Sequence, residues 1–397
     1  MKGGLTVKLN ENVKTVIKRL SDMGFRADVV GGSVRDHLLG REPSDFDLTT
    51  NATPDEMKLA FKGLRTVDTG IKHGTVSVIL DGEQYEVTTY RKDGEYKDHR
   101  HPVNVTFTNE LLDDLSRRDF TVNAMCYNPD EGITDAFGGK GDLQNGIIRA
   151  VGDPWRRFDE DALRILRAVR FASTLGFRIE DETARAARSL SHLLKDVSGE
   201  RIAVEWRKLV GGVGAYDVIN EYAEILSTFL FLDKIVLPKR ELFEAAAPIV
   251  RHIGIFALSG ADKAPIASER MRLDKKSATT VDLALSNLNR SVNTVKDQLF
   301  LFKDVGAFVG RILVECAICL GLADRSALLI TDEIEAKGMP YRVRDLAVDG
   351  KDVISRGIKG EGVGKMLDTL LVAVINGEVE NDRNALLEYI KDHTDNV

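Results

Sequence analysis

The sequence has little cysteine and no long apolar run. Three cysteines in 397 residues are too few for a disulfide framework, so a reducing compartment is expected. No stretch approaches the roughly 18 consecutive apolar residues of a membrane span. The opening residues, MKGGLTVKLNENVK, lack the apolar core of a signal peptide. We therefore expect a cytoplasmic protein without a membrane partner.

Two catalytic signatures are also missing. The sequence contains no G-x-x-x-x-G-K-[ST] motif, which disfavours a Walker-type ATPase. It contains no His-Asp dipeptide, which disfavours an added metal phosphohydrolase module. Cys316 and Cys319 form a C-x-x-C, but they lie in the apolar run ILVECAICLGL, which favours a buried helix over a metal or redox site.

The charge balance is acidic overall and basic in one window. The formal net charge of −7 argues mildly against a nucleic-acid partner, yet a phosphate-binding surface needs only local positive charge. Residues 149–208 contain 13 Lys and Arg against 10 Asp and Glu. A nucleic-acid partner is therefore compatible with the sequence.

The pattern of apolar residues changes along the chain. A chain of 397 residues is expected to form two or more domains. The first third predicts a helix near 11–23 and short strands at 27–32, 46–50, 75–82 and 84–91, which indicates a small mixed sheet. From about residue 150 the pattern is helical nearly throughout. The expected fold is an α+β head followed by a long all-α remainder.

Two features of the head favour a site for a metal and phosphates. An apolar strand leads into Gly31 and Gly32, where backbone N–H groups can approach a phosphate, and Ser33 is the expected N-cap of the next helix. Asp45 and Asp47 are two residues apart in a predicted strand, so their carboxylates would share one face. Mg²⁺ suits such a pair together with substrate phosphates. The alternative for the two aspartates is a polar strand end in solvent.

A third carboxylate is available from the strand QYEVTTYR. Glu86 would join the pair if this strand lies beside the first, and otherwise it is a surface glutamate. Two metals held by such carboxylates would activate a hydroxyl and stabilise a leaving pyrophosphate.

Six successive motifs resemble those of the class II tRNA nucleotidyltransferases, the CCA-adding enzymes of the polymerase-β-like superfamily. They are GGSVRDHLLG (31–40), DFD (45–47), RRDFTVNA (117–124), FGGKGDL (137–143), RFDEDALRILRAVRF (157–171) and SGERIAVE (198–205). The resemblance implies a nucleotidyltransferase head at 1–149, a helical neck at 150–212, a helical body at 213–335 and a helical tail at 336–397. It also implies template-independent addition of C, C and A to tRNA from CTP and ATP.

The same resemblance assigns residues of the head. Asp45 and Asp47 would hold the metals. Gly32 and Arg35 would contact the incoming triphosphate, and its phosphates and ribose would also meet Arg118 and Asp119. For Arg118 the alternative is a surface ion pair with Asp113 or Asp114. The loop at 92–104 resembles the flexible loop associated with the switch from CTP to ATP, and its presence favours full CCA addition.

The stretch at 156–177 predicts one helix that carries Asp161 and Arg164 on the same face, three residues apart. Aspartate accepts hydrogen bonds and arginine donates them, which matches the amino donor and ring-nitrogen acceptor of cytosine and adenine. Uracil and guanine present the reverse order. Because mismatched buried polar groups are costly, this pair is expected to favour cytosine and adenine over uracil and guanine by about 10³-fold. The alternative is an ordinary ion pair on a solvated helix face.

Two further arginines follow Asp161 and Arg164 on the same predicted helix. Arg167 and Arg170 suit the triphosphate or stacking on the base, and the resemblance also assigns them nucleotide contacts. Glu160 either contacts the nucleotide or caps the helix.

The expected partner is tRNA, held at its acceptor stem and elbow by shape and backbone charge. Candidate contacts in the tail are lysines and arginines that could equally be solvated: Lys351, Arg356, Lys359 and Lys365. No DNA partner is expected. The rival functions are a bacterial poly(A) polymerase, which usually carries a basic C-terminal extension where this chain ends in DHTDNV, and a catalytically inactive RNA-binding relative.

Overall fold

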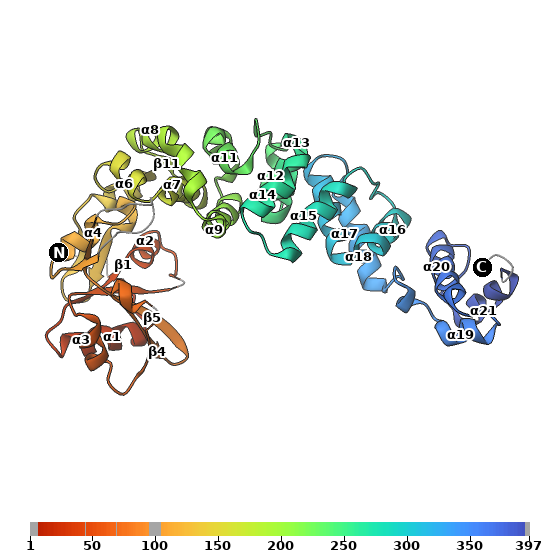
Figure 1. The fold of residues 1–397 in the computed structure, drawn as a ribbon, viewed down its shortest axis with the longest axis horizontal. Coiled ribbons are helices and arrows are strands. Elements are labelled where there is room, and N and C mark those ends of the chain that lie inside the picture. Colours follow the sequence, from red (N-terminus) through yellow and green to blue (C-terminus); the bar gives the residue numbers. More distant parts are fainter. Residues whose placement is uncertain (1–6, 44, 69, 95–104, 394–397) are drawn as a thin grey trace. The chain divides into compact units, whose positions relative to one another are not determined.

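The computed structural model describes residues 7–43, 45–68, 70–94 and 105–393. The chain divides into two compact units, Met1–Phe229 and Leu230–Val397 (Figure 1). The first unit combines a sheet with helices, and the described part of the second is helical. These features confirm the α+β class, whereas the finer division into head, neck, body and tail stays a prediction.

A seven-stranded sheet forms the centre of the part of the first unit predicted as the head, with its strands between residues 27 and 135. Its strand order is β3-β4-β5-β2-β1-β8-β9. β2 and β5 run parallel and the other neighbours antiparallel, so the sheet is mixed, as predicted. The strands are β1 (Ala27–Val30), β2 (Asp47–Thr50), β3 (Arg65–Val67), β4 (Thr75–Leu80), β5 (Glu83–Thr89), β8 (Met125–Asn128) and β9 (Gly132–Asp135).

Short helices and a hairpin accompany this sheet. α1 (Glu11–Ser21) begins where the Asn10 side chain accepts the Val13 N–H at 2.8 Å, and it buries Val16 and Leu20 on one face. α1 and α3 (Pro54–Ala60) lie side by side near β4 and β5 (Figure 1). The remaining elements of the head are α2 (Gly32–Leu38), β6 (Arg91–Asp93), β7 (Val105–Phe107), α4 (Leu111–Ser116), α5 (Gly139–Gln144) and β10 (Ile147–Ile148).

The second half of the first unit is built on α7 (Leu163–Leu175) packed against α9 (Gly199–Val210). α7 ends at Gly176, whose φ of 72° suits glycine. One short strand interrupts the stretch predicted as all-helical: β11 (Arg178–Ile179) pairs parallel with β10, because Arg178 N donates to Gly146 O. The other helices are α6 (Pro154–Glu160), α8 (Asp181–Leu190), α10 (Ala215–Glu221) and α11 (Ala223–Leu230).

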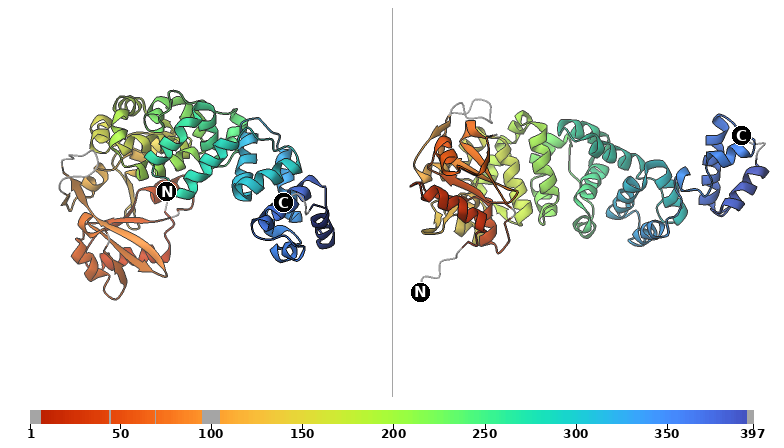
Figure 2. Two further views of the ribbon diagram at one scale, coloured as in Figure 1. Left: turned by 45° about the vertical axis from the view of Figure 1, so that its right-hand side comes forward. Right: turned by 90° about the horizontal axis from the view of Figure 1, so that it is seen from below.

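The second unit is helical in both views of Figure 2. Its helices are α12 (Arg240–Ala245), α13 (Pro248–Ser259), α14 (Ala264–Arg270), α15 (Lys275–Asn287), α16 (Val295–Val305), α17 (Ala307–Cys319), α18 (Ser326–Lys337), α19 (Gly350–Ser355), α20 (Glu361–Asn376) and α21 (Arg383–Asp392). Cys316 and Cys319 are free thiols buried in α17, which confirms the buried-helix prediction. Among the described residues, no helix is both long and apolar enough to span a bilayer.

Candidate active site

A glycine turn connects β1 to α2. Gly31 has a φ of +80°, and a Cβ there would lie 3.2 Å from Nη1 of Arg118. The residue thus needs glycine both for its backbone and for the close approach of a guanidinium. The predicted N-cap is wrong: α2 already begins at Gly32 with Gly31 as its cap residue. Ser33 therefore lies in the first turn, and its hydroxyl donates to the Val30 carbonyl at 3.3 Å.

The three predicted carboxylates lie around the start of β2. Asp47 is the first residue of this strand and is in register with Glu86 on the parallel strand β5. Asp45 lies two residues before the strand, so the prediction that both aspartates belong to one strand is right for Asp47 and wrong for Asp45. The pKa of Asp47 is raised by desolvation and by the charge of Asp45; Arg118 opposes this shift and Glu86 adds to it.

This arrangement fits a divalent cation. Burial is the largest cause of the raised pKa of Asp47, and the charges of Asp45 and Glu86 add to it; a bound cation would favour the ionised carboxylate against both. Among the described residues, no three His, Cys, Asp or Glu side chains are gathered into a complete ligand set. Mg²⁺ is compatible with fewer protein ligands because it commonly binds one or two carboxylates and completes its coordination with waters and substrate phosphates. Asp45 and Asp47 are the residues that would hold it.

Arg118 lies between these carboxylates and a buried aspartate. Its Nη2 atom donates to Oδ2 of Asp114 at 3.3 Å, and the Asp114 side chain has no exposed surface. Asp114 also accepts from Arg117 at 2.8 Å, whereas Asp113 pairs with Lys92. The ion pair considered from sequence therefore exists with Asp114, although it is buried rather than on the surface. The buried Nε of Arg118 has no hydrogen-bond partner among the described residues, so it can still donate to an anionic ligand.

Asp119 connects the head with α7. Its carboxylate accepts hydrogen bonds from Asn123 Nδ2 at 3.2 Å and from Arg167 Nε at 2.8 Å. Burial opposes ionisation, but the charge and hydrogen bond of Arg167 prevail and lower the pKa of Asp119 to about 2. Asn123 in turn accepts from Arg35 Nη1 at 2.6 Å. Four side chains from the head and α7 thus form one continuous polar network.

The arginines of α7 continue this network. Arg170 Nε donates to Oε2 of Glu205 on α9 at 2.7 Å, and Arg167 Nη1 lies 3.6 Å from the other carboxylate oxygen. Arg35, Arg167 and Arg170 all lie within 5.5 Å of the ring centroid of Phe171. The two arginine positions predicted from sequence are therefore close to Arg35, but each is held by a carboxylate in this structure.

Replacing Glu205 by glutamine is expected to destabilise the first unit by about 2–3 kcal/mol, because the buried Arg170 loses its countercharge and the partly exposed Arg167 loses a second one. Urea unfolding followed by tryptophan fluorescence measures this, since both tryptophans, Trp155 and Trp206, lie in that unit. Glu224→Gln is the matched control: its pair with Arg188 is exposed, and a change below about 1 kcal/mol is expected. Equal effects of both substitutions would contradict this structural role.

The predicted helix at 156–177 is broken at Asp161. α6 ends at Glu160, Asp161 is extended with φ −141° and ψ 102°, and α7 begins at Leu163. The Asp161 carboxylate accepts the Leu163 N–H at 3.1 Å from one residue before the N-cap position of α7, which Ala162 occupies. It also accepts from Arg201 Nη2 at 2.9 Å. The aspartate is thus fixed by both local and long-range contacts.

Arg164 has different partners from Asp161. Its guanidinium donates to Oε2 of Glu160 at 3.1 Å and to the Arg117 carbonyl at 3.0 Å. Glu160 also binds Arg156 and Arg157, at 2.9 and 2.7 Å. Glu160 is therefore the centre of an arginine cluster and does not cap a helix. Asp161 and Arg164, the side chains predicted to read the base, are close in sequence but hydrogen-bond to different partners.

Two stretches of the chain match known protein families, and relatives match nearly all of it. Residues 27–149 match the family described as "Poly A polymerase head domain", and residues 176–222 match "Probable RNA and SrmB- binding site of polymerase A". The CCA-adding enzyme of Pediococcus pentosaceus is 38% identical over 392 residues, covering 96% of this chain and 97% of the relative. That of Levilactobacillus brevis is 35% identical over 395 residues, with 96% and 98% covered. The chain belongs to the CCA-adding enzyme family.

The structural comparison agrees with this membership. The Bacillus stearothermophilus CCA-adding enzyme in complex with CTP has a TM-score of 0.81 at 30% identity, with 98% of both chains covered. The Thermotoga maritima CCA-adding enzyme complexed with tRNA has a TM-score of 0.67 at 21% identity, which shows a shared fold. The predicted family is confirmed, and the poly(A) polymerase alternative is not favoured.

Three polar residues of this CCA-adding enzyme make contacts in the site although the sequence predicts no role for them. They are Asn123 in RRDFTVNA and both Arg201 and Glu205 in SGERIAVE. A signal for Glu205 was present: it falls on the apolar face of an amphipathic helix, beside Trp206 and Leu209, where an acid needs a partner. The residues 95–104 of the predicted flexible loop lie outside the described residues.

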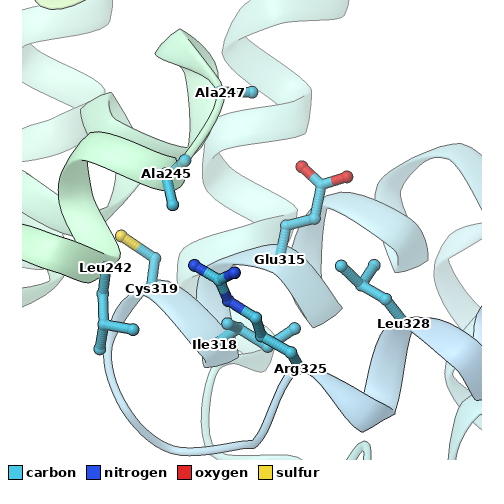
Figure 3. A pocket seen from close by; sticks show the side chains of 9 residues that line it. Leu242, Ala245, Ala247, Glu315, Ile318, Cys319, Arg325 and Leu328 are labelled. Carbon is cyan, nitrogen blue, oxygen red and sulfur yellow. The ribbon is translucent and has the colours of Figure 1, made fainter.

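A cavity of about 370 Å³ in the second unit contains none of the predicted site residues. Leu242, Ile318 and Leu328 contribute apolar surface, and Glu315 and Arg325 contribute charge (Figure 3). Burial raises the pKa of Cys319 in the same cavity to about 11, with Arg251 opposing the shift, so this thiol is inert at neutral pH.

Proposed function

We propose that this CCA-adding enzyme extends the 3′ end of tRNA by C, C and A, using CTP and ATP and releasing pyrophosphate. The observation that carries this function is the 38% identity to a CCA-adding enzyme over 96% of the chain. The carboxylates at the start of β2 and the arginine network beside them supply the chemistry that such a reaction needs. We also propose a cytoplasmic location, in keeping with three free thiols.

In the transfer step, the terminal RNA hydroxyl attacks the α-phosphorus, the bond to pyrophosphate breaks, and the hydroxyl proton passes to solvent. Asp45 and Asp47 would hold Mg²⁺, with Glu86 as a third carboxylate beside Asp47. Bound Mg²⁺ would neutralise phosphate charge and favour deprotonation of the attacking hydroxyl. No covalent intermediate on the protein is required.

The triphosphate would lie near the start of α2, where the first backbone N–H groups, beginning with that of Gly32, have no partner within the helix and Arg35 is nearby. Arg118 would donate to a phosphate oxygen from an N–H that Asp114 does not bind, such as that on the unpartnered Nε. Asp119 would contact the ribose, and its network with Arg167 would keep it ionised and oriented. Arg170 would act through this network, since Glu205 holds its guanidinium.

Base choice would rest on Asp161 and Arg164. Asp161 can keep its bonds to Leu163 and Arg201 while accepting a base amino group, because each carboxylate oxygen has two lone pairs. Arg164 would exchange its bond to Glu160 for the ring nitrogen of the base. Glu160 remains neutralised by its two other arginines during this exchange.

The acceptor stem and elbow of tRNA would be bound through backbone charge by the helices of the second unit. The tail candidates named from sequence are exposed: Lys351, Arg356, Lys359 and Lys365.

The proposal is tested with purified protein, Mg²⁺ and tRNA that ends before the first C, at CC, or complete. Each RNA is incubated with labelled CTP, ATP, UTP or GTP, and the products are resolved by length. We expect addition of C, C and A that then stops. Long A tails would instead identify a poly(A) polymerase, and no incorporation with any nucleotide would identify an inactive RNA-binding relative.

A further inference from the structure

Arg201, in the first turn of α9, binds the Asp161 carboxylate through one of its two terminal nitrogens. Its Nη2 donates to Oδ2 of Asp161 at 2.9 Å and to Oδ1 at 3.3 Å. Its Nη1 is buried and has no hydrogen-bond partner among the described residues. A buried N–H without a partner is costly and rare. Next to a carboxylate that would bind a base, such an N–H indicates a ligand atom that accepts a hydrogen bond.

The two oxygens of Asp161 differ in how many hydrogen bonds they already accept. Oδ1 accepts the Leu163 N–H as well as Arg201, whereas Arg201 is the partner of Oδ2 among the described residues. Oδ2 therefore has the larger remaining capacity to accept the amino group of a base. An amino group bound there lies next to Arg201, because Nη2 donates to the same oxygen.

The atom beside the amino group differs between the two bases that Asp161 and Arg164 would accept. Adenine has the acceptor N7 beside its N6 amino group, on the side away from N1, whereas cytosine has a C–H beside its N4 amino group. Guanine also has N7, but beside a carbonyl oxygen that would face the Asp161 carboxylate. An acceptor beside an amino group on this side of the ring therefore identifies adenine among the four bases.

The lengths involved permit a contact between Nη1 of Arg201 and N7 of adenine. The terminal nitrogens of a guanidinium are held about 2.3 Å apart by its planar fork. Hydrogen bonds between such groups are about 2.9 Å long, and N6 and N7 of adenine are about 3 Å apart. Oδ2, Nη2, Nη1, N7 and N6 can therefore close a five-membered ring of contacts, in which N6 donates to Oδ2 while Nη1 donates to N7.

We propose that Arg201 is a specificity-determining residue for the addition of AMP, and that its Nη1 donates to N7 of adenine when ATP is bound. With CTP in the site, Nη1 meets no such acceptor, so this contact favours ATP over CTP. A protein group that hydrogen-bonds one atom of a substrate discriminates against an analogue without that atom, because the group is then left unpaired. This inference rests on the proposed function, since it presumes that Asp161 accepts the amino group of the base.

The test compares ATP with 7-deaza-ATP, in which a C–H replaces N7 while N6 and N1 are retained. Addition to tRNA ending at CC gives kcat/KM for each nucleotide. The wild type is expected to prefer ATP about tenfold, because the analogue leaves Nη1 without a partner. Arg201→Lys has no fork to donate to Oδ2 and N7 together, so its ratio is expected to fall to about 1–2. A purely structural role of Arg201 would leave this ratio unchanged, since both nucleotides meet the same variant.

The matched control is Arg207→Lys, which changes an exposed arginine of the same helix and is expected to keep the wild-type ratio. If the wild type uses 7-deaza-ATP as efficiently as ATP, Nη1 does not read N7 and the inference is wrong. It is equally wrong if Arg201→Lys still prefers ATP, because another group then reads N7. The wild-type comparison decides the matter even if Arg201→Lys does not fold. Wild-type protein that adds no AMP to this RNA would overturn the proposed function instead.

Discussion

Replacing Asp47 by asparagine will reduce the rate of both CMP and AMP incorporation by about 10³-fold or more, because several kcal/mol of transition-state stabilisation depends on the carboxylate that would hold the metal. The amide is neutral and has nearly the same volume, so the strand β2 and its register with Glu86 are preserved. Single-turnover incorporation on tRNA ending before the first C and at CC measures the two steps separately.

A matched control separates chemistry from folding. Asp55 lies exposed in the first turn of α3, in the same part of the chain, and Asp55→Asn is expected to leave the rate within about twofold. Glu86→Gln tests the third carboxylate and should give an intermediate loss if its role is to support Asp47. Retention of more than a tenth of the wild-type rate by Asp47→Asn would show that the metal is held elsewhere.

The sequence predicts those helices and strands that have a clear pattern of apolar residues. Strands β1, β2, β4 and β5 were predicted because short β-branched runs end at glycine or aspartate. β8 was not predicted: all four residues of MCYN are buried, so the alternation that marks a half-buried strand is absent. The helical remainder was predicted from its periodicity, with β11 as the exception.

The site was predictable where its residues are neighbours in sequence and unpredictable where distant segments meet. The Asp161 break could not be read from RRFDEDALRIL, whose residues are compatible with one helix. At the break, the Asp161 carboxylate accepts the Leu163 N–H at the start of α7 and also binds Arg201, 40 residues along the chain. Likewise, the pairs Asp119–Arg167 and Arg170–Glu205 span 48 and 35 residues. Spacing rules concern positions within one element and therefore do not report such contacts.

Replacing Asp161 and Arg164 together by alanine will relax base choice more than it slows the chemistry. The expected preference of about 10³-fold for CTP over UTP on tRNA ending before the first C should fall to about tenfold or less. The physical reason is that the mispaired polar groups, oxygen against carboxylate and N–H against guanidinium, are no longer present to exclude uracil. The ratio of kcat/KM for the two nucleotides measures the change.

Three contacts in the structure determine the controls for this double variant. The Asp161 carboxylate also accepts the first N–H of α7, so its loss costs about 1 kcal/mol of stability, and folding must be verified at the assay temperature. The control is Asp181→Ala with Arg185→Ala. It removes an exposed acid from the first turn of helix α8 and an exposed base from the same helix, and it should leave base choice unchanged. Glu160→Gln frees Arg164 from its nearest carboxylate and should leave UTP excluded. If the double variant at 161 and 164 still excludes UTP and GTP as strongly as the wild type, the base is read by other residues.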